Sequence, residues 1–467
     1  MDGLECSEIL FSQIDLGDRF DSDYYTKNYL HISDQMSKVS TKKLGKLATA
    51  VASAFYPAAT QLYSEGDTAF ARCVDCVSFP VITKDQDSRF EKIPYAFGKG
   101  NKGISFIKAE DIIITKVGTP CYASILTDYD EIALSRTVMG LTEIHGIDPY
   151  YLMVFLRCKY GFEQLFRQRE LTIQYQLTLP RVKAVDVFLA DDKLQKAVKK
   201  LCEKSRDLQK ESNEAYHLAE QILLEIVRCP DFSTLSAHSI KSINESFVLS
   251  GRLDAEYYQP KYESIIQKLS TSETVLSLCK MYDKNFVPRE KESYQYIELA
   301  DVGQSGDISD VDTQCGSDLP TRARRIVKSG QIIVSSIEGS LQSCALITDE
   351  YDGALCSTGF YVIDSDCINS ETLLVLFKSE PIQALMKQRC SGTILTAISK
   401  DEFLSMPLPM IDEDVQRVIA TRVQESFALR KQSKKQLEHA KQAVEMAIEQ
   451  GEYAALEWLK DKIPAEV

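Results

Sequence analysis

Several sequence motifs in the first half of the chain recur in the second half, and this repeat limits the folds that the chain can adopt. Residues 19–25, Arg-Phe-Asp-Ser-Asp-Tyr-Tyr, return as residues 252–258, Arg-Leu-Asp-Ala-Glu-Tyr-Tyr. Three later stretches also return: residues 111–115 at 331–335, 123–128 at 344–349, and 164–169 at 384–389. The offset is 233 residues at the first match and 220 or 221 at the later ones. A repeat of this size predicts two copies of one architecture, and therefore two similar sites.

Each copy runs into a long charged segment with helical periodicity. Small and apolar residues recur at a spacing of 3.5, which is typical of a coiled-coil seam. The first seam runs through Leu194, Val198, Leu201, Ser205, Leu208, Ser212, Ala215, Ala219, Ile222 and Ile226. The second runs through Val415, Ile419, Arg422, Ser426, Leu429, Ser433, Gln436, Ala440, Ala443 and Ala447. Each helix needs a partner, and the obvious partner is the other helix.

The pairing of these helices can be parallel or antiparallel. We favour the antiparallel arrangement because it relates the two halves by a two-fold axis within one chain. Serines occupy the same seam positions in both copies, and such small residues allow close helix approach. The second copy is about 12 residues shorter between its opening motif and its Ile-rich strand, as the two offsets show.

The repeat predicts an α+β fold with two similar mixed α/β domains, separated by two long helices that form an antiparallel coiled coil. The expected boundaries are residues 1–190 for the first domain and 191–228 for the first helix. Residues 229–410 form the second domain and 411–450 the second helix, and 451–467 remain as a C-terminal tail. Within the first domain, residues 149–169 predict one helix, because their apolar residues lie on one face.

Composition favours a globular chain in the cytoplasm. Apolar residues make up 44% of the 467 residues, and no apolar run approaches the roughly 20 residues that span a bilayer. The first residues lack the pattern of a signal peptide. In this compartment, disulfides between the 13 cysteines are not expected. Cys73 and Cys76 form a Cys-x-x-Cys without a second pair, so small buried hydrophobes are favoured over zinc or redox chemistry.

The net charge of −14 argues against generic nucleic-acid binding, because neutralising phosphates requires lysine and arginine. The charge is uneven, however. Residues 1–190 carry 21 basic and 24 acidic side chains, whereas residues 228–410 carry 17 and 25. A basic groove can coexist with this total if the acids lie elsewhere, or a basic partner can supply part of the phosphate contact.

Two motifs resemble ligand-binding loops but have simpler explanations. Residues 98–103 match Gly-x-Gly-x-x-Gly, but a strand-like stretch follows where a dinucleotide loop needs a helix. This turn either touches phosphate or is a plain surface turn. Residues 148–151, Asp-Pro-Tyr-Tyr, resemble the adenine-binding loop of amino-methyltransferases without its second proline. The segment simply starts a helix, where proline is favoured.

No catalytic constellation is evident. The acids that open the two long helices, at 191–192 and 412–414, are better explained as helix caps than as metal ligands. The five histidines show no ligand spacing, and no nucleophile elbow or Walker loop occurs. We therefore expect a binding protein with no catalytic residue and no bound metal or cofactor.

The candidate DNA contacts are basic or hydroxyl side chains that gather locally, and among them Lys387 and Arg389 repeat the cluster that contains Arg167 and Arg169. Arginine and lysine bind phosphate, and arginine also reads guanine. The alternative is that these residues form solvated surfaces. The candidates are Lys99, Lys102, Lys116, Thr119, Arg136, Arg167, Arg169, Arg322, Arg324, Arg325, Lys328, Ser336, Lys387, Arg389, Thr393 and Lys400.

The order of domains and helices, together with several motifs, resembles the specificity subunits of type I restriction–modification enzymes. Residues 110–119, Glu-Asp-Ile-Ile-Ile-Thr-Lys-Val-Gly-Thr, are similar to the family's Gly-Asp-Ile-Leu-Ile-Ser-Arg-x-Gly-Thr. Residues 391–399 and 406–409 look like its Gly-Ser-Thr-x-x-x-Ile-Ser and Ile-Pro-Leu-Pro. Gln195 and Gln416 look like glutamines of its spacer helices. The second copy departs by placing Ser336 opposite Lys116.

This resemblance implies a subunit that reads a split sequence in double-stranded DNA for phage defence, with one half read by each target recognition domain. The helices would set the gap and dock two adenine methyltransferase subunits. Those partners would carry S-adenosylmethionine, and a motor nuclease would bring ATP and magnesium. A specificity subunit of a different methyltransferase-based system and a non-enzymatic coiled-coil scaffold remain the alternatives. An enzyme is the least favoured.

Overall fold

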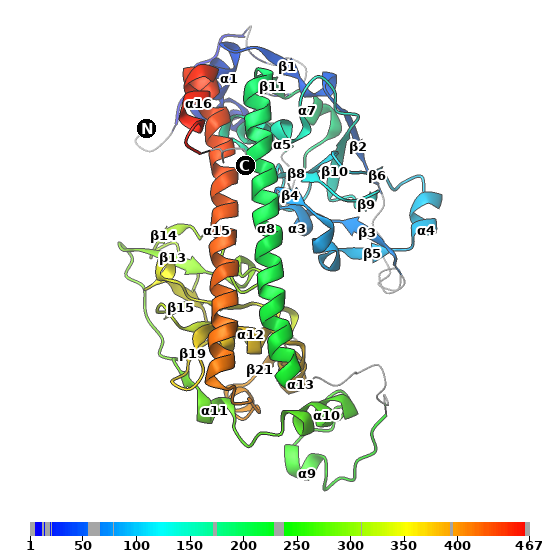
Figure 1. The fold of residues 1–467 in the computed structure, drawn as a ribbon. Helices are drawn as coiled ribbons and strands as arrows, with labels where there is room; N and C mark the ends of the chain where they lie inside the picture. The colour runs from blue at the N-terminus through cyan, green and yellow to red at the C-terminus, as the bar shows by residue number, and fades with distance from the viewer. Residues whose placement is uncertain are drawn as a thin grey trace. The chain divides into compact units, whose positions relative to one another are not determined.

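A computed structural model describes residues 5–11, 14, 19, 21–54, 66–77, 79–170, 175–227, 238–309, 311–392 and 396–462. The chain divides into two compact units. Unit 1 comprises Met1–Lys210 and Lys431–Val467, and unit 2 comprises Glu211–Arg430. Each unit therefore contains one mixed domain and one part of each long helix (Figure 1).

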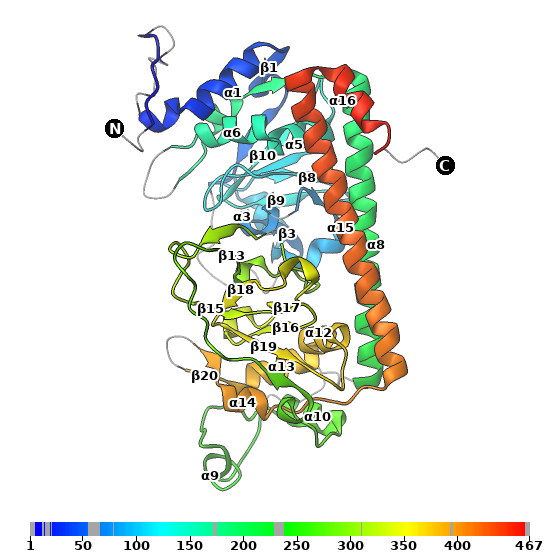
Figure 2. The same ribbon diagram turned by 90° about the vertical axis from the view of Figure 1, so that its left-hand side faces the viewer.

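The two long helices are α8 (Asp192–Val227) and α15 (Glu413–Gln450). In unit 1, Ser205 of α8 meets Ser433, while the amide of Asp191 at the start of α8 binds Glu452 beyond the end of α15. In unit 2, Ser212 meets Ser426. The helices lie side by side in Figures 1 and 2, and these contacts confirm the expected antiparallel pairing.

The seam serines pair reciprocally. The Oγ atoms of Ser205 and Ser433 lie 2.8 Å apart, and each hydroxyl also lies within 3.0 Å of the other residue's carbonyl oxygen. In unit 2, the Oγ atoms of Ser212 and Ser426 lie 3.0 Å apart. All four residues are at most 4% exposed. Because buried hydroxyls without partners cost free energy, the pairing removes the penalty of placing polar residues in this seam.

The domain of unit 1 contains two sheets. The first has the order β2 (Thr49–Ala52), β10 (Val138–Thr142), β7 (Ile112–Thr115), β8 (Ala123–Leu126) and β4 (Val81–Ile82). The second has the order β5 (Glu91–Ile93), β3 (Thr68–Ala71), β9 (Ile132–Leu134) and β6 (Phe106–Ile107). A small ladder joins β1 (Thr41–Lys43) to β11 (Asp186–Phe188).

Unit 2 repeats this strand order, except that the described residues of its first sheet contain no counterpart of β4. Its first sheet has the order β12 (Lys280–Met281), β19 (Phe360–Asp364), β16 (Ile332–Ser335) and β17 (Cys344–Leu346). Its second has the order β14 (Thr313–Cys315), β13 (Ser293–Ile297), β18 (Leu355–Ser357) and β15 (Ala323–Ile326). The parallel pair β3–β9 returns as β13–β18. Together with the paired long helices, these matching sheets confirm the predicted α+β architecture.

The Ile-rich central strands are buried on both faces. In β7, Ile112 and Ile114 join the large core that the helices cover, whereas Ile113 joins the core between the sheets. In β16, Ile332 and Ile333 divide between two cores in the same way. These central strands therefore need apolar residues at every position, whereas a strand with one exposed face would alternate apolar and polar residues.

Helices cover the outer face of each first sheet. In unit 1 they are α1 (Lys27–Ser37), α5 (Pro149–Arg157), α6 (Lys159–Arg167), α7 (Leu179–Lys183) and α16 (Glu452–Leu459). The short helix α3 (Cys73–Cys76) contacts β7 of the first sheet, and α4 (Tyr95–Gly100) packs on the second sheet. In unit 2 they are α10 (Pro260–Leu269), α11 (Val275–Leu278), α12 (Ser370–Lys378), α13 (Glu380–Arg389) and α14 (Lys400–Leu404); α9 (Phe247–Ser250) precedes them.

The prediction of one helix over residues 149–169 was wrong. The chain forms α5 and α6, which are separated at Cys158. Gly161 explains the break, since a β-carbon there would lie 2.0 Å from the carbonyl oxygen of Phe155. Two short helices can pack this closely only where no side chain intervenes.

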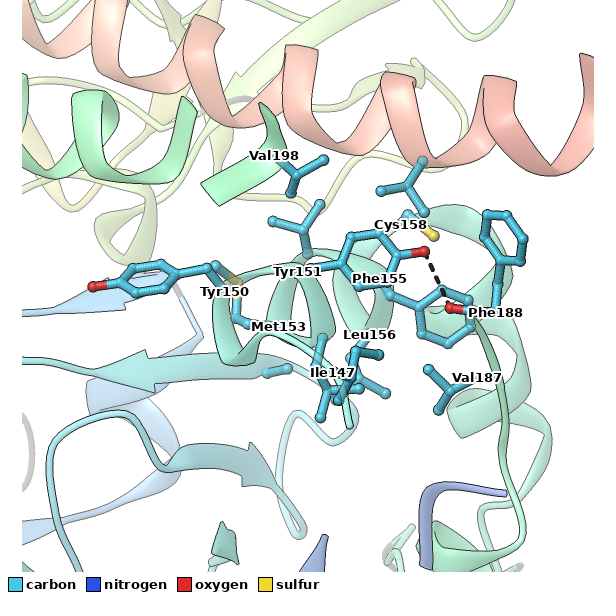
Figure 3. Packing of buried hydrophobic residues seen from close by; sticks show 14 of the residues in the cluster. Ile147, Tyr150, Tyr151, Met153, Phe155, Leu156, Cys158, Val187, Phe188 and Val198 are labelled. Carbon is cyan, nitrogen blue, oxygen red and sulfur yellow. Dashed lines mark hydrogen bonds between the residues drawn. The ribbon is translucent and has the colours of Figure 1, made fainter. Parts of the chain in front are cut away.

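The core of unit 1 gathers around α5. Tyr151 is fully buried, and its hydroxyl donates to the carbonyl oxygen of Phe188, 3.1 Å away (Figure 3). Phe155 lies in the same cluster, as does Val198 of α8. This packing fixes α8 against the domain through a satisfied tyrosine in an otherwise apolar contact.

The opening motifs, residues 19–25 and 252–258, form the same set of hydrogen bonds in both units. Arg19 donates to Asp21 and to the carbonyl oxygen of Arg169, and the hydroxyl of Tyr25 donates to the carbonyl oxygen of Arg19. In unit 2, Arg252 donates to Asp254 and to the carbonyl oxygen of Cys390. The motif therefore anchors the start of each domain to the end of α6 or α13, and its repetition has a structural cause.

Candidate nucleic-acid interface

In unit 1, three predicted contact residues come together where β7 ends. The amide of Lys116 donates to the carbonyl oxygen of Thr137 at 2.8 Å, in the turn between β9 and β10. Arg136, the residue before Thr137, is exposed. The carbonyl oxygen of Thr119 accepts from the thiol of Cys73, at the start of α3. Lys116, Thr119 and Arg136 thus lie on one junction of three loops, which we call junction 1.

Unit 2 forms the equivalent junction 2 at the end of β16. The amide of Ser336 donates to the carbonyl oxygen of Gly359 at 2.9 Å, and the carbonyl oxygen of Ser336 accepts from Ile398 at 2.8 Å. In junction 1 the carbonyl oxygen of Lys116 accepts from Leu177 in the same manner. The backbone is therefore duplicated, although the lysine is replaced by a serine.

The cations of junction 2 come from a different strand. Arg322, Arg324 and Arg325 lie on or beside β15, which pairs with β18 next to the turn that Ser336 meets. Arg322 pairs with Glu298 at 3.0 Å, and Arg325 donates to the carbonyl oxygen of Phe360. The two junctions therefore present different chemistry: junction 1 carries the half-buried Lys116 and the exposed Arg136 on its turns, whereas junction 2 is flanked by the arginines of β15.

The remaining basic candidates lie on other elements of the two units. Lys99 lies on α4, pairs with Glu131 at 2.5 Å and covers the ring of Phe106. Lys102 is exposed in the following turn. Lys400 pairs with Asp283 at the start of α14. The exposed candidates Lys328 and Lys387 lie before β16 and on α13.

The arginines at the ends of α6 and α13 hold the protein together. Arg167 donates to the carbonyl oxygen of Tyr24 at 2.7 Å, and its guanidinium lies 4.0 Å from the centre of that ring. Arg169 stacks on Phe166. Arg389 is only 8% exposed, and burial lowers its pKa. These contacts account for the repeated arginines structurally. Thr393, the last candidate, lies outside the described residues.

A cation that donates to backbone carbonyl oxygens marks the same helix end in both units. Arg157 ends α5 and donates to the carbonyl oxygens of Ala123 and Val77, and burial lowers its pKa to about 10. Lys378 ends α12 at the corresponding position and donates to the carbonyl oxygen of Gln342 at 2.6 Å. Burial lowers the pKa of Lys378 as well. Both cations tie a sheet loop to the helix layer and are not surface contacts.

The cysteine pair and the helix-opening acids have structural surroundings. Cys76 is fully buried in the core between the sheets, and Cys73 is half-buried. Asp75 accepts from the amide of Arg72, as Asp301 accepts from Glu298 in unit 2. In the part of the chain that is described, no group of three or more His, Cys, Asp or Glu residues could hold a metal ion.

Sequence reasoning missed the partners that build the junctions. Thr137 holds Lys116 and also accepts from the amide of Cys73 at 3.1 Å, and Gly359 holds Ser336. The repeat offset of 220 or 221 falls just short of them, because Thr137 and Gly359 are 222 residues apart. The helix-cap interpretation of the acids holds for Asp412, whose carboxylate accepts from the amide of Asp414.

Comparison with known proteins gives solved structures only. No protein-family model and no curated protein matches the chain. The S subunit of a type I restriction-modification system from M. genitalium is 11% identical, covers 92% of this chain and 96% of its own, with a TM-score of 0.37. The HsdS subunit from Thermoanaerobacter tengcongensis is 13% identical, covers 88% and 97%, with a TM-score of 0.25. The type IIG restriction endonuclease BpuSI is 9% identical, covers 37% and 28%, with a TM-score of 0.30.

None of the described helices is both long enough and apolar enough to cross a membrane.

Proposed function

We propose that the chain is the DNA sequence-recognition subunit of a type I restriction–modification enzyme, or of a related methyltransferase-based system. The observation that carries the proposal is the pair of junctions, one in each unit, on the same backbone with different side chains. A protein that reads a two-part asymmetric DNA sequence needs two similar supports with different contact residues.

The protein's own chemistry supports a binding role. Junction 1 offers Lys116 and Arg136 to phosphates or base edges, and junction 2 offers the β15 arginines. The paired helices would set the unread gap between the half-sites. In this proposal they also dock two adenine methyltransferase subunits, which bind S-adenosylmethionine, while a motor nuclease brings ATP and magnesium. The subunit itself would act in the cytoplasm, without a catalytic residue.

The test is a footprint of the full chain, together with its methyltransferase subunits, on duplex DNA. We expect protection in two blocks separated by an unprotected gap. Charge reversal by Lys116→Glu and Arg136→Glu should weaken protection of one block only, and Arg324→Glu should weaken the other. Lys268→Glu reverses an exposed charge on α10, away from junction 2, and is the control.

The competing explanation is a coiled-coil scaffold for other proteins. It predicts no sequence-specific protection even when the partners are present. Protection of a single continuous block, or equal loss from both blocks in every variant, would also contradict the proposal.

A further inference from the structure

A stripe of four lysines runs along the part of α8 that belongs to unit 1. Lys193, Lys196, Lys200 and Lys204 follow one another at steps of three and four residues. At 3.6 residues per turn they fall within about 80° of the helix circumference. The first three are exposed and Lys204 is half-buried. Lys193, Lys196 and Lys204 form no ion pair with any residue that the structure describes. We call these four residues the lysine stripe.

The repeat provides an internal comparison for this stripe. The corresponding positions of α15, 221 residues later, are Asp414, Arg417, Thr421 and Glu425, all of them exposed. Arg417 is neutralised there by ion pairs with Asp414 and Glu413. Helix formation and solubility impose the same demands on both helices, so they do not explain why one copy carries four lysines.

The rest of α8 has the opposite character. Continued into unit 2, the same face carries Glu211, Glu214 and Glu225 together with Leu218, which is 44% exposed. The helix parts 192–210 and 431–450 in unit 1, all of which are described, carry no exposed large apolar residue. Protein–protein interfaces are depleted in lysine and have apolar centres. The lysine stripe therefore suits a phosphate backbone better than a protein surface.

The dimensions agree with this ligand. Eleven residues separate Lys193 from Lys204, or about 16 Å at 1.5 Å per residue. This length corresponds to roughly five base pairs of duplex DNA at about 3.4 Å each. Lysine presents a compact, rotatable charge without the fork by which arginine reads a base. A row of lysines can therefore bind phosphates without reading sequence.

We propose that the lysine stripe of α8 binds the phosphate backbone of duplex DNA in the stretch whose bases the protein does not read. This inference rests on the proposed function, because it assumes that the chain binds DNA. It adds a second contact surface, independent of the junctions, that supplies affinity without specificity. It also gives a chain of net charge −14 a concentrated basic surface.

The experiment measures how duplex binding by the full chain depends on salt. The probe is a 30-base-pair duplex of arbitrary sequence, followed by fluorescence anisotropy between about 50 and 200 mM salt. The variant carries Lys193→Gln, Lys196→Gln, Lys200→Gln and Lys204→Gln; glutamine has a helix propensity close to that of lysine. The control, Arg417→Gln, neutralises an exposed cation at a corresponding position of α15. Circular dichroism checks that both variants keep their helices.

We expect the slope of log K against log salt to fall by about 0.9 for each phosphate that the protein no longer neutralises, or about 3 to 4 in the quadruple variant. The decrease should be equal for duplexes of different sequence, and the control should keep the wild-type slope. An unchanged slope in the quadruple variant overturns phosphate binding by the lysine stripe and leaves the proposed function intact. Weaker methyltransferase binding with an unchanged DNA slope identifies a protein partner and also overturns it. A wild-type chain that binds no duplex, even with its partners, overturns both proposals.

Discussion

Gln416 should contribute more to the stability of its unit than Gln195, although the two occupy the same place in the repeat. The side chain of Gln416 is 5% exposed and makes three hydrogen bonds. It accepts from the amide of Asn369 at 2.7 Å and donates to the carbonyl oxygens of Cys367 and Ile411, each at 2.9 Å. These bonds tie the start of α15 to the start of α12.

Gln195 makes two such bonds. It accepts from the amide of Asp148 at 2.8 Å and donates to the carbonyl oxygen of Ala190 at 2.7 Å. A typical bond is worth about 1 kcal/mol, so Gln416→Met should cost about 3 kcal/mol and Gln195→Met about 2 kcal/mol. Methionine keeps the length of the side chain, so the decrease in stability reports the hydrogen bonds rather than a cavity.

Native-state hydrogen exchange measures both effects in one chain. Gln416→Met should speed exchange of the α12 amides on the order of 100-fold, and Gln195→Met that of the α5 amides on the order of 30-fold. Each variant should leave the other unit unchanged, because the two glutamines lie in different units. Exchange in α12 that speeds by less than tenfold, or a larger effect from Gln195→Met, would refute this reasoning.

Three further substitutions test buried polar groups by urea unfolding. Tyr216→Phe should raise the unfolding free energy by up to about 1 kcal/mol, because the buried hydroxyl of Tyr216 lacks a described partner. Tyr151→Phe should lower the unfolding free energy by about 1 kcal/mol, because it removes the hydrogen bond to the carbonyl oxygen of Phe188. Arg430→Met leaves the half-buried carboxylate of Asp307 without its cation and should cost about 2 kcal/mol; no change would contradict the ion pair. The hydrogen bond from Arg252 holds the pKa of Asp254 below its usual 3.8, so this stabilisation is complete above pH 4 and is lost as the pH falls further. Arg252→Gln should therefore flatten the acid dependence below pH 4, and an unchanged profile would disprove the linkage.

The duplicated architecture was predictable because it depends on patterns that recur along the chain. The serines of the two seams stood out by position alone, and their small size favoured close antiparallel packing. The fully apolar Ile112–Ile114 run required a strand covered on both faces. Burial patterns of this kind are set by local spacing, which a sequence displays directly.

The break at Cys158 was not predictable, because Gly161 matters through a contact with Phe155 that periodicity does not encode. Arginines posed the same difficulty. Arg167 and Arg389 carry the positive charge expected of residues that contact DNA, yet each donates hydrogen bonds to carbonyl oxygens of its own domain. Charge predicts attraction to phosphate, whereas the free carbonyl groups that compete for a guanidinium become visible only in the fold.

The way each unit is assembled has a consequence for biosynthesis. Unit 2 is one continuous stretch, and its core can close once residue 430 has been made. Unit 1 needs side chains from both ends of the chain, because its core includes Ala440, Val444 and Leu459 as well as α5. The apolar faces of unit 1 therefore stay exposed until the last helices emerge from the ribosome, and unit 2 folds before then. During synthesis, the first half to be made is the last to be finished.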